Sequence, residues 1–337
     1  ALTYLLSGEE CRFHLKPNEY VEEAFRKSGF LKTMKEKGTD IAVYTADPEM
    51  IGSEGMQIIT NSIHKGEETE HFVYPQLEKN LARISLYKCA PYLLKNLFRY
   101  QTEIINISSF DYEPFLQLED PVFYDFLQAN DGVRIREDIK TSFKLYHLFS
   151  THPGAYWDSN LKQADELKNE DILRGSFRVI ERLSDDLKEA GIFDKALIIV
   201  TADHGSSDGD KVRFERNRAS CPLLMVKYPE SDTSRTLMVN NAPVSHDDLF
   251  RTIHIALGCE DGGTYGSGKA LTEFEEGKER IRYHYYTAID EGTREVALIE
   301  YEIDEDAYDF KNWKKTGQYW DVIYSANPVS EKRIQGK

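Results

Sequence analysis

Two residues with metal-ligand chemistry, Asp203 and His204, stand together after an apolar run in the sequence Ala196-Leu-Ile-Ile-Val-Thr-Ala-Asp-His-Gly205. The run lacks polar alternation, which predicts a strand buried on both faces, as in a parallel sheet covered by helices. Ligands of open α/β sheets bind beyond the carboxyl ends of the strands, so a carboxylate and an imidazole suit a metal site there. The pattern alone also fits an Asp203 that caps the next loop and a His204 that lies at the surface.

A further histidine, His152, follows a predicted strand over residues 142–150 and precedes a Pro-Gly turn. A lone histidine is more often structural than catalytic, but this place beyond the end of a strand favours a functional role. Trp157 lies five residues further on. Its indole ring either stacks on a sugar or glycerol moiety or covers the helix that is predicted to follow it.

Three arginines, Arg213, Arg216 and Arg218, lie in a polar loop between His204 and the next predicted strand. Guanidinium groups bind phosphate or sulfate through paired hydrogen bonds, so these arginines are candidate substrate-binding residues. Because 30% of the residues are charged, solvated loop arginines are the alternative interpretation.

Four stretches carry a family resemblance. Residues 201–205, Thr-Ala-Asp-His-Gly, resemble the metal-binding motif of the sulfatase-like branch of the alkaline phosphatase superfamily, which includes sulfatases, phosphoethanolamine transferases and lipoteichoic acid synthases. Residues 145–153 resemble the strand that ends in the substrate-side histidine of that family. Residues 221–229 resemble its next strand, and residues 244–258 resemble the helix that follows.

The resemblance implies a fold of the α/β class, an alkaline-phosphatase-like three-layer α/β/α sandwich. Asp203 and His204 would be its metal ligands and His152 its catalytic histidine. We expect a catalytic domain over residues 1–275 that lacks its N-terminal part. From residue 276 to 337, aromatic and β-branched runs separated by charged turns predict a small antiparallel β subdomain packed on it.

The expected activity is metal-dependent transfer or hydrolysis of phosphate or sulfate esters on cell-surface glycans or lipids, as in a lipoteichoic-acid-synthase-like phosphotransferase. The alternatives are a sulfatase and a non-catalytic domain that binds a surface polymer. A mixed carboxylate and imidazole ligand set suits Mn²⁺ or Zn²⁺ better than Ca²⁺, which prefers oxygen ligands alone.

The resemblance places the nucleophile a few residues before Ala1. Thr3 and Ser7 are the nearby hydroxyls, and we expect both only to decorate the first helix. Close members of the family carry transmembrane helices before an exported domain. We therefore expect an extracytoplasmic protein that is anchored to the membrane by a region upstream of this sequence.

Composition narrows the possible partners. The 337 residues include 42 basic and 58 acidic side chains, a net charge of −16, which would repel nucleic acid or an anionic membrane unless basic residues cluster locally. No apolar run approaches the roughly 20 residues that a membrane-spanning helix needs. The four cysteines permit two disulfides or none and form no C-x-x-C pair.

The remaining patterns predict the elements that position these residues. Residues 52–70 read as a loop, and residues 101–140 fit either an insertion or a connecting arm. Ser245 is expected to cap a helix together with Asp248. His246 in the first turn of that helix could approach the metal site, but the resemblance gives it no role there, so we expect it to lie at the surface. The other predicted helices cover residues 1–8, 17–38 with a break near Gly29, 77–100 with a break at Pro91, and 160–191; the other predicted strands cover residues 41–44, 221–229, 281–286, 296–301 and 319–324.

Overall fold

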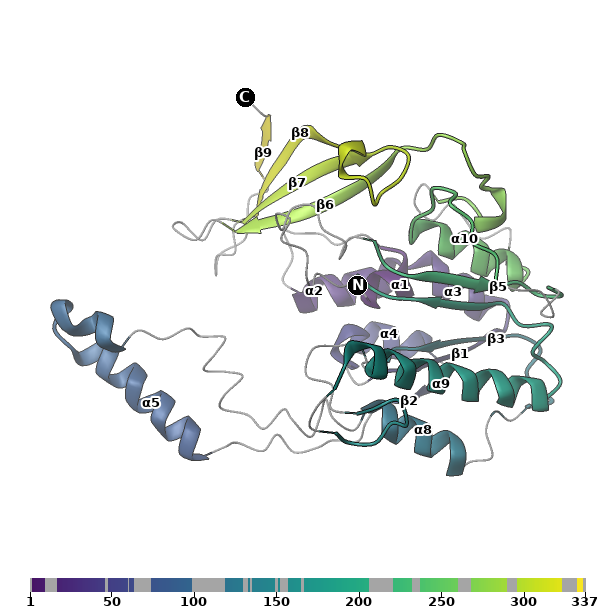
Figure 1. The fold of residues 1–337 in the computed structure, drawn as a ribbon, viewed down its shortest axis with the longest axis horizontal. Helices are drawn as coiled ribbons and strands as arrows, with labels where there is room; N and C mark the ends of the chain where they lie inside the picture. Colours follow the sequence, from purple (N-terminus) through teal and green to yellow (C-terminus); the bar gives the residue numbers. More distant parts are fainter. Residues whose placement is uncertain are drawn as a thin grey trace. The chain divides into compact units, whose positions relative to one another are not determined.

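The structure is a computed structural model that describes most of the chain (Figure 1). The described residues are 2–9, 17–45, 48–59, 61–63, 74–98, 119–129, 133, 135–148, 151, 157–164, 167–205, 221–231, 237–259, 268–289, 296–322 and 332–335. They belong to two compact units, and the predicted domain boundary after residue 275 stays a prediction. The first unit comprises Ala1–Ser62, Arg136–Leu145 and Ile192–Lys337, and the second comprises Ile63–Ile135 and Tyr146–Gly191.

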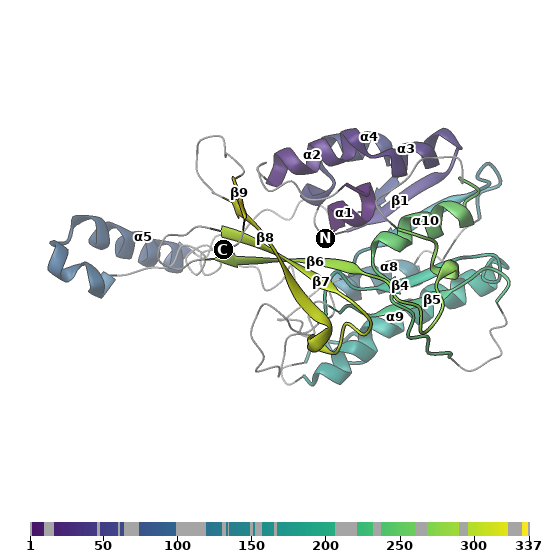
Figure 2. The same ribbon diagram turned by 90° about the horizontal axis from the view of Figure 1, so that it is seen from above.

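The first unit begins with helices that pack on one another (Figure 2). Helix α1 (Leu2–Ser7) ends at Gly8, whose φ of +73° is the left-handed conformation expected after a helix. Helices α2 (Pro17–Lys27) and α3 (Gly29–Glu36) are separated where a break near Gly29 was predicted. The Ser28 side chain caps α3 by accepting a hydrogen bond from the Leu31 N–H.

The predicted loop over residues 52–70 is wrong at two places. Residues Gly52–Ile58 form helix α4, after a short 3₁₀ helix η1 (Pro48–Met50), and Asn61–Ile63 form strand β2. The glycines in this stretch suggested a loop, but one of them, Gly55, is needed for close helix packing. A side-chain carbon at Gly55 would lie 2.7 Å from Ile51 and 3.0 Å from Phe25, so only glycine lets α4 approach α2 this closely.

The hydrophobic core of this unit lies between the helices and strand β1 (Asp40–Tyr44). Phe30 has no exposed surface, and its ring makes edge contacts with Phe143 and Phe250 and stacks on His254. The core therefore joins α3 to strand β3 (Ser142–Tyr146) and to helix α10 (Asp247–Ala256). Its other buried members are Leu2, Leu6, Val21, Phe25, Leu31, Met34, Ile41, Val43, Ile51, Ile58, Ile59 and Cys259.

The described strands form three sheets. One has the order β2-β1-β3, where β2 is Asn61–Ile63, and a second consists of β4 (Ile198–Thr201) and β5 (Leu224–Lys227). β4 and β5 pair antiparallel, so the parallel pairing expected at Asp203 is wrong for this neighbour. All four β4 residues are half-buried, so the expected full burial of that strand is wrong as well.

The small antiparallel sheet expected after residue 276 is confirmed (Figure 1). Its order is β6-β7-β8-β9, with all pairs antiparallel. Ile299, Tyr301, Ile303 and Trp313 form its buried cluster. The strands are β6 (Arg282–Ile289), β7 (Val296–Ile303), β8 (Trp313–Val322) and β9 (Lys332–Gln335), and two 3₁₀ helices, η4 (Leu271–Glu273) and η5 (Phe310–Asn312), lie before β6 and before β8.

The second unit is helical in its described part. Helix α5 (Tyr74–Cys89) and 3₁₀ helix η2 (Tyr92–Phe98) confirm the predicted break at Pro91, and helix α8 (Glu119–Ala129) lies in the stretch that had no assignment. Helix α9 (Asn169–Glu189) begins nine residues later than predicted. The reason is a turn in which the Asp158 carboxylate accepts hydrogen bonds from the N–H groups of Asn160 and Lys162.

These elements confirm the α/β class. The three described thiols, Cys89, Cys221 and Cys259, are free, while Cys11 lies outside the described residues. Within the described part of the chain, every helix is too short or too polar to cross a bilayer.

The core position of Phe30 generates a stability prediction. Phe30→Ala leaves a cavity between α3, β3 and α10, and we expect the free energy of unfolding to fall by about 3–5 kcal/mol in urea titrations. Leu237→Ala is the control, because Leu237 is 72% exposed and its truncation should change stability by less than about 0.5 kcal/mol. A loss below about 1 kcal/mol for Phe30→Ala would contradict this core.

His254 generates a pH prediction. Burial lowers the pKa of His254 below its usual 6.5, more than the hydrogen bond of Nε2 to the Phe30 carbonyl oxygen raises it. At a pH between the lowered pKa of the folded protein and the ordinary pKa of the unfolded chain, the unfolded chain binds more protons. The free energy of unfolding therefore falls as the pH drops below about 6.5. We expect His254→Gln, which keeps an N–H donor, to lose less free energy of unfolding than the wild type between about pH 7.5 and 5.5. An unchanged pH dependence in denaturant titrations would refute this assignment.

Candidate functional site

The end of β4 is fixed by its pairing with β5. Thr201 pairs with Leu224, and the Thr201 hydroxyl donates a hydrogen bond of 2.8 Å to the Leu223 carbonyl oxygen. The chain then leaves the sheet at Ala202 and turns at Asp203 and His204. Both predicted ligands therefore lie immediately beyond the carboxyl end of a strand, as expected.

Asp203 and His204 are oriented by local hydrogen bonds. Oδ1 of Asp203 accepts a bond of 2.9 Å from the His204 N–H, and Nδ1 of His204 lies 2.7 Å from the Gly205 carbonyl oxygen. A carbonyl can only accept, so Nδ1 carries the proton and Nε2 presents its lone pair. Nε2 lies 3.8 Å from Oδ2 of Asp203, and both side chains are about half or more exposed, at 67% for His204 and 48% for Asp203.

This separation is close to what a shared metal requires. Two ligand atoms at about 2.0–2.1 Å from one tetrahedral Zn²⁺ lie roughly 3.3 Å apart, so a small side-chain movement would let both atoms bind one ion. The described residues contain no group of three or more His, Cys, Asp or Glu side chains that could hold a metal. The donor atoms and the spacing of Asp203 and His204 suit two ligands of one divalent metal, and the metal site itself stays a prediction.

His246 is a functional candidate that the sequence interpretation considered near the metal site and then assigned to the surface. The expectation that it lies at the surface is wrong, because its side chain is half-buried and Nε2 lies 3.2 Å from the Thr201 hydroxyl oxygen. Burial lowers the pKa of His246 below 6.5, against a hydrogen bond to the Ala202 backbone and the carboxylates of Asp247 and Asp203, which raise it. The signal available in the sequence was a histidine beside two carboxylates at a helix start.

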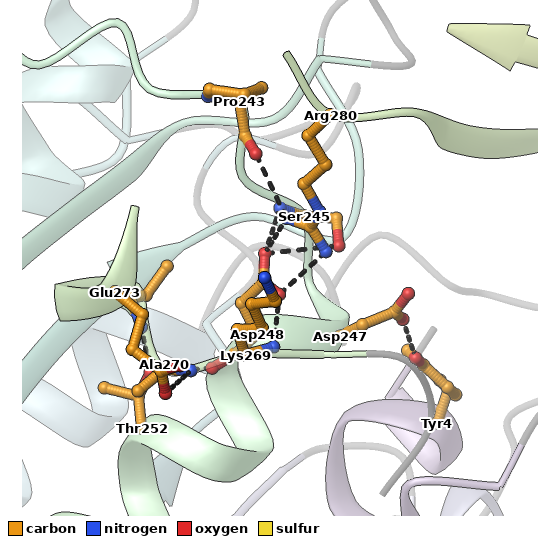
Figure 3. A network of polar contacts seen from close by, with 11 residues as sticks. Tyr4, Pro243, Ser245, Asp247, Asp248, Thr252, Lys269, Ala270, Glu273 and Arg280 are labelled. Atoms are coloured by element: carbon orange, nitrogen blue, oxygen red, sulfur yellow. Dashed lines mark hydrogen bonds and ion pairs between the residues drawn. The ribbon is translucent and has the colours of Figure 1, made fainter. Parts of the chain in front are cut away.

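The start of α10, which carries His246, is held by the buried carboxylate of Asp248 (Figure 3). Arg280 binds it with two hydrogen bonds, from Nη1 to Oδ2 at 2.6 Å and from Nη2 to Oδ1 at 2.9 Å. Oδ2 also accepts from the Ser245 N–H at 2.7 Å, and Oδ1 from the Lys269 N–H at 3.0 Å. The prediction that Ser245 caps this helix is wrong, because the residue at the N-terminal cap of α10 is His246 and makes no side-chain cap hydrogen bond. The expected link between Ser245 and Asp248 is present, with the Asp248 carboxylate as the acceptor of the Ser245 N–H.

Further contacts fix the same helix start on its other sides. The Tyr4 hydroxyl of α1 donates to the Asp247 carboxylate, as Figure 3 shows. A side-chain carbon at Gly268 would lie only 2.1 Å from the Asp247 carbonyl oxygen, so this backbone approach requires glycine. The position of His246 beside Thr201 therefore follows from contacts with α1 and with residues 268–280.

The remaining predicted site residues fall into two groups. His152, Arg213, Arg216 and Arg218 lie outside the described residues, so their roles stay predictions. Trp157 is only 1% exposed, which is incompatible with stacking on a sugar and favours the alternative that it covers the following helix. A side-chain carbon at Gly175 of α9 would lie 3.5 Å from the Trp157 ring, so the two do pack together.

The two hydroxyls of α1 are buried rather than placed on its surface. Thr3 donates a hydrogen bond of 2.8 Å to the Met50 carbonyl oxygen, and the Ser7 oxygen accepts from the Glu9 N–H at 3.1 Å. Their exposed fractions are 3% and 1%. Both residues therefore have a structural role, and the predicted nucleophile before Ala1 stays a prediction.

Comparisons with solved structures give several similarities, among them the following two. A protein of the alkaline phosphatase superfamily from Vibrio parahaemolyticus matches with a TM-score of 0.40 and 12% identity, over 100% of this chain and 70% of that one. A protein assigned as a sulfatase, YidJ from Bacteroides fragilis, matches with a TM-score of 0.42 and 11% identity, over 91% of this chain and 75% of that one. No protein-family model and no curated protein sequence matches. Because both TM-scores are below 0.5, the arguments about the site depend on the residues of this chain alone.

The buried ion pair at α10 generates a prediction with a matched control. Arg280→Ala leaves the Asp248 carboxylate buried without its cation, and we expect the free energy of unfolding to fall by about 3–5 kcal/mol. Arg251→Ala removes an arginine from a pair with Glu273 in which both side chains are about half exposed, and should cost less than about 1 kcal/mol. Urea titrations of the two variants measure the difference, and equal losses would show that the Asp248 pair has no special role.

Proposed function

We propose that this chain forms part of a metal-dependent enzyme that transfers or hydrolyses phosphate or sulfate esters on cell-surface glycans or lipids. Within that class we propose a phosphotransferase like the lipoteichoic acid synthases. The observation that carries the proposal is the pair of ligand atoms, Oδ2 of Asp203 and Nε2 of His204, 3.8 Å apart and exposed beyond the end of β4.

Asp203 and His204 would hold the cation, with Mn²⁺ or Zn²⁺ favoured over Ca²⁺ because one ligand is an imidazole. When bound, such an ion polarises the ester oxygen and lowers the pKa of a coordinated hydroxyl group. The chain itself orients the ligands. The Gly205 carbonyl oxygen fixes the proton of His204 on Nδ1, and the His204 N–H holds Oδ1 of Asp203, which leaves Oδ2 turned toward Nε2.

His246 would act beside the ligands rather than on the substrate. Its lowered pKa keeps the ring neutral near pH 7, so it adds no positive charge next to a bound cation. Its contact with Thr201 and its hydrogen bond to the Ala202 backbone hold the residues that precede Asp203. His152 would bind or protonate the transferred group, and Arg213, Arg216 and Arg218 would bind its anionic oxygens.

The proposed substrate implies a place in the cell. Esters of surface glycans and lipids are found outside the cytoplasm, so we propose an extracytoplasmic enzyme that is anchored through a region upstream of this sequence. Disulfide formation is the usual fate of paired cysteines in such a compartment, yet free thiols are also compatible with it.

The experiment is elemental analysis of the purified full-length protein, before and after titration with Zn²⁺ or Mn²⁺. We expect about one metal ion per chain in the wild type and its loss in the double variant Asp203→Ala with His204→Ala. The control variant Glu36→Ala with Glu49→Ala removes two exposed carboxylates elsewhere in the chain and should keep the metal. A wild type that neither contains nor gains metal would refute the proposal.

Hydrolysis of p-nitrophenyl phosphate, bis(p-nitrophenyl) phosphate and p-nitrophenyl sulfate then distinguishes the chemistries. The same double variant should lose at least about 100-fold in kcat/KM on the substrate that the wild type prefers. A preference for the sulfate ester would replace the phosphotransferase proposal with the sulfatase alternative.

A further inference from the structure

Helix α5 and the 3₁₀ helix η2 of the second unit carry large apolar side chains that face solvent. Their exposed fractions range from 47% for Leu94 to 87% for Tyr92. The other members are Leu81, Leu86 and Leu97, and together the five define what we call the α5–η2 surface. Five large apolar side chains exposed within one 25-residue segment indicate an interaction site more than the scattered exposure of single residues does.

Helix α5 and η2 pack against each other through their inner faces. Asn80 of α5 is buried, Ile84 and Tyr87 are half-buried, and Nζ of Lys95 in η2 lies 5.3 Å from the centre of the Tyr87 ring. Residues 80, 84 and 87 share one side of a helix with 3.6 residues per turn. Leu81 and Leu86 lie outside that inner side, so closing the pair of helices does not cover them.

The charges of this segment are opposite to those of the chain as a whole. Residues 74–98 contain four basic side chains and one acidic side chain, a net charge of +3 in a protein of net charge −16. On the helical wheel Lys79 and Arg83 border the outward side of α5 on one flank, and Lys88 borders it on the other. Leu81 and Leu86 lie between these flanks.

We propose that the α5–η2 surface binds an anionic lipid bilayer, lying in the interface without crossing it. Helices that bind membrane surfaces combine exposed leucine and aromatic residues with lysine and arginine, and their binding depends on anionic lipid. The exposed leucines would enter the headgroup boundary, and the bordering cations would contact lipid phosphates. A second copy of this chain is the less suitable occupant, because two surfaces of net charge +3 would repel each other.

This inference is independent of the metal site. The experiment is vesicle flotation of the full chain with phosphatidylcholine vesicles, with or without about 30 mol% phosphatidylglycerol. We expect binding to the anionic vesicles, weak binding to the neutral ones, and release at about 0.5 M NaCl, where charges are screened over a few ångströms.

Two variants test the two parts of the surface. Lys79→Gln, Arg83→Gln and Lys88→Gln together should reduce partitioning into anionic vesicles on the order of 100-fold. Leu81→Ser, Leu86→Ser and Leu97→Ser together should reduce it at least about tenfold. Circular dichroism checks that each variant keeps its helices.

Control variants carry comparable changes at exposed positions elsewhere. Lys278→Gln, Lys311→Gln and Lys314→Gln remove three exposed lysines, and Leu237→Ser with Met238→Ser removes two exposed apolar side chains; neither control should alter vesicle binding. The proposal is overturned if the wild type does not bind anionic vesicles, or if the controls reduce binding as much as the α5–η2 variants. It is also overturned if light scattering instead shows self-association that the leucine variant abolishes.

Discussion

The ion pair between Asp248 and Arg280 is the constraint on which the candidate site depends. A carboxylate without exposed surface is costly to bury, and the cost is offset only when its oxygens are well hydrogen-bonded. Asp248 meets that condition through two guanidinium and two backbone N–H groups, drawn from Arg280, Ser245 and Lys269. The residues around the start of α10 can therefore take few other positions.

One consequence of this constraint is the place of His246. A residue immediately before a rigidly held helix is itself held in place by that helix. His246 is such a residue, and it lies beside Thr201 at the end of β4. Two parts of the chain about 45 residues apart thus meet at one turn. Asp203 and His204 thus have a half-buried neighbour whose pKa is lowered by burial, which suits a site that is proposed to hold a cation.

The sequence predicted those parts of the fold that are determined by local periodicity and by turn residues. The strand before Asp203, the break at Gly29 and the break at Pro91 each follow from a few neighbouring residues. The prediction failed where tertiary contacts override the local signal. Gly55 resembles a loop residue because its role, letting α4 contact Phe25, is set by a residue 30 positions away.

The candidate site likewise has features that local sequence predicted and features that depend on tertiary contacts. The adjacency of Asp203 and His204 is local and was predictable, as was the link from Ser245 to Asp248. The contact of His246 with Thr201 could not be derived from local sequence, because it depends on the antiparallel pairing of β4 with β5 and on Arg280, 34 residues further on. The burial of Trp157 depends on Gly175, which no pattern around Trp157 reveals.

The free thiols differ in a way that has a practical consequence. Burial raises the pKa of both the Cys221 and the Cys259 thiols, which lowers the fraction of reactive thiolate at neutral pH. Cys89, at the end of α5, is exposed. Among the described cysteines it should therefore be the first to react with a maleimide, and a fluorophore attached there would report on the surroundings of α5 without any engineered residue.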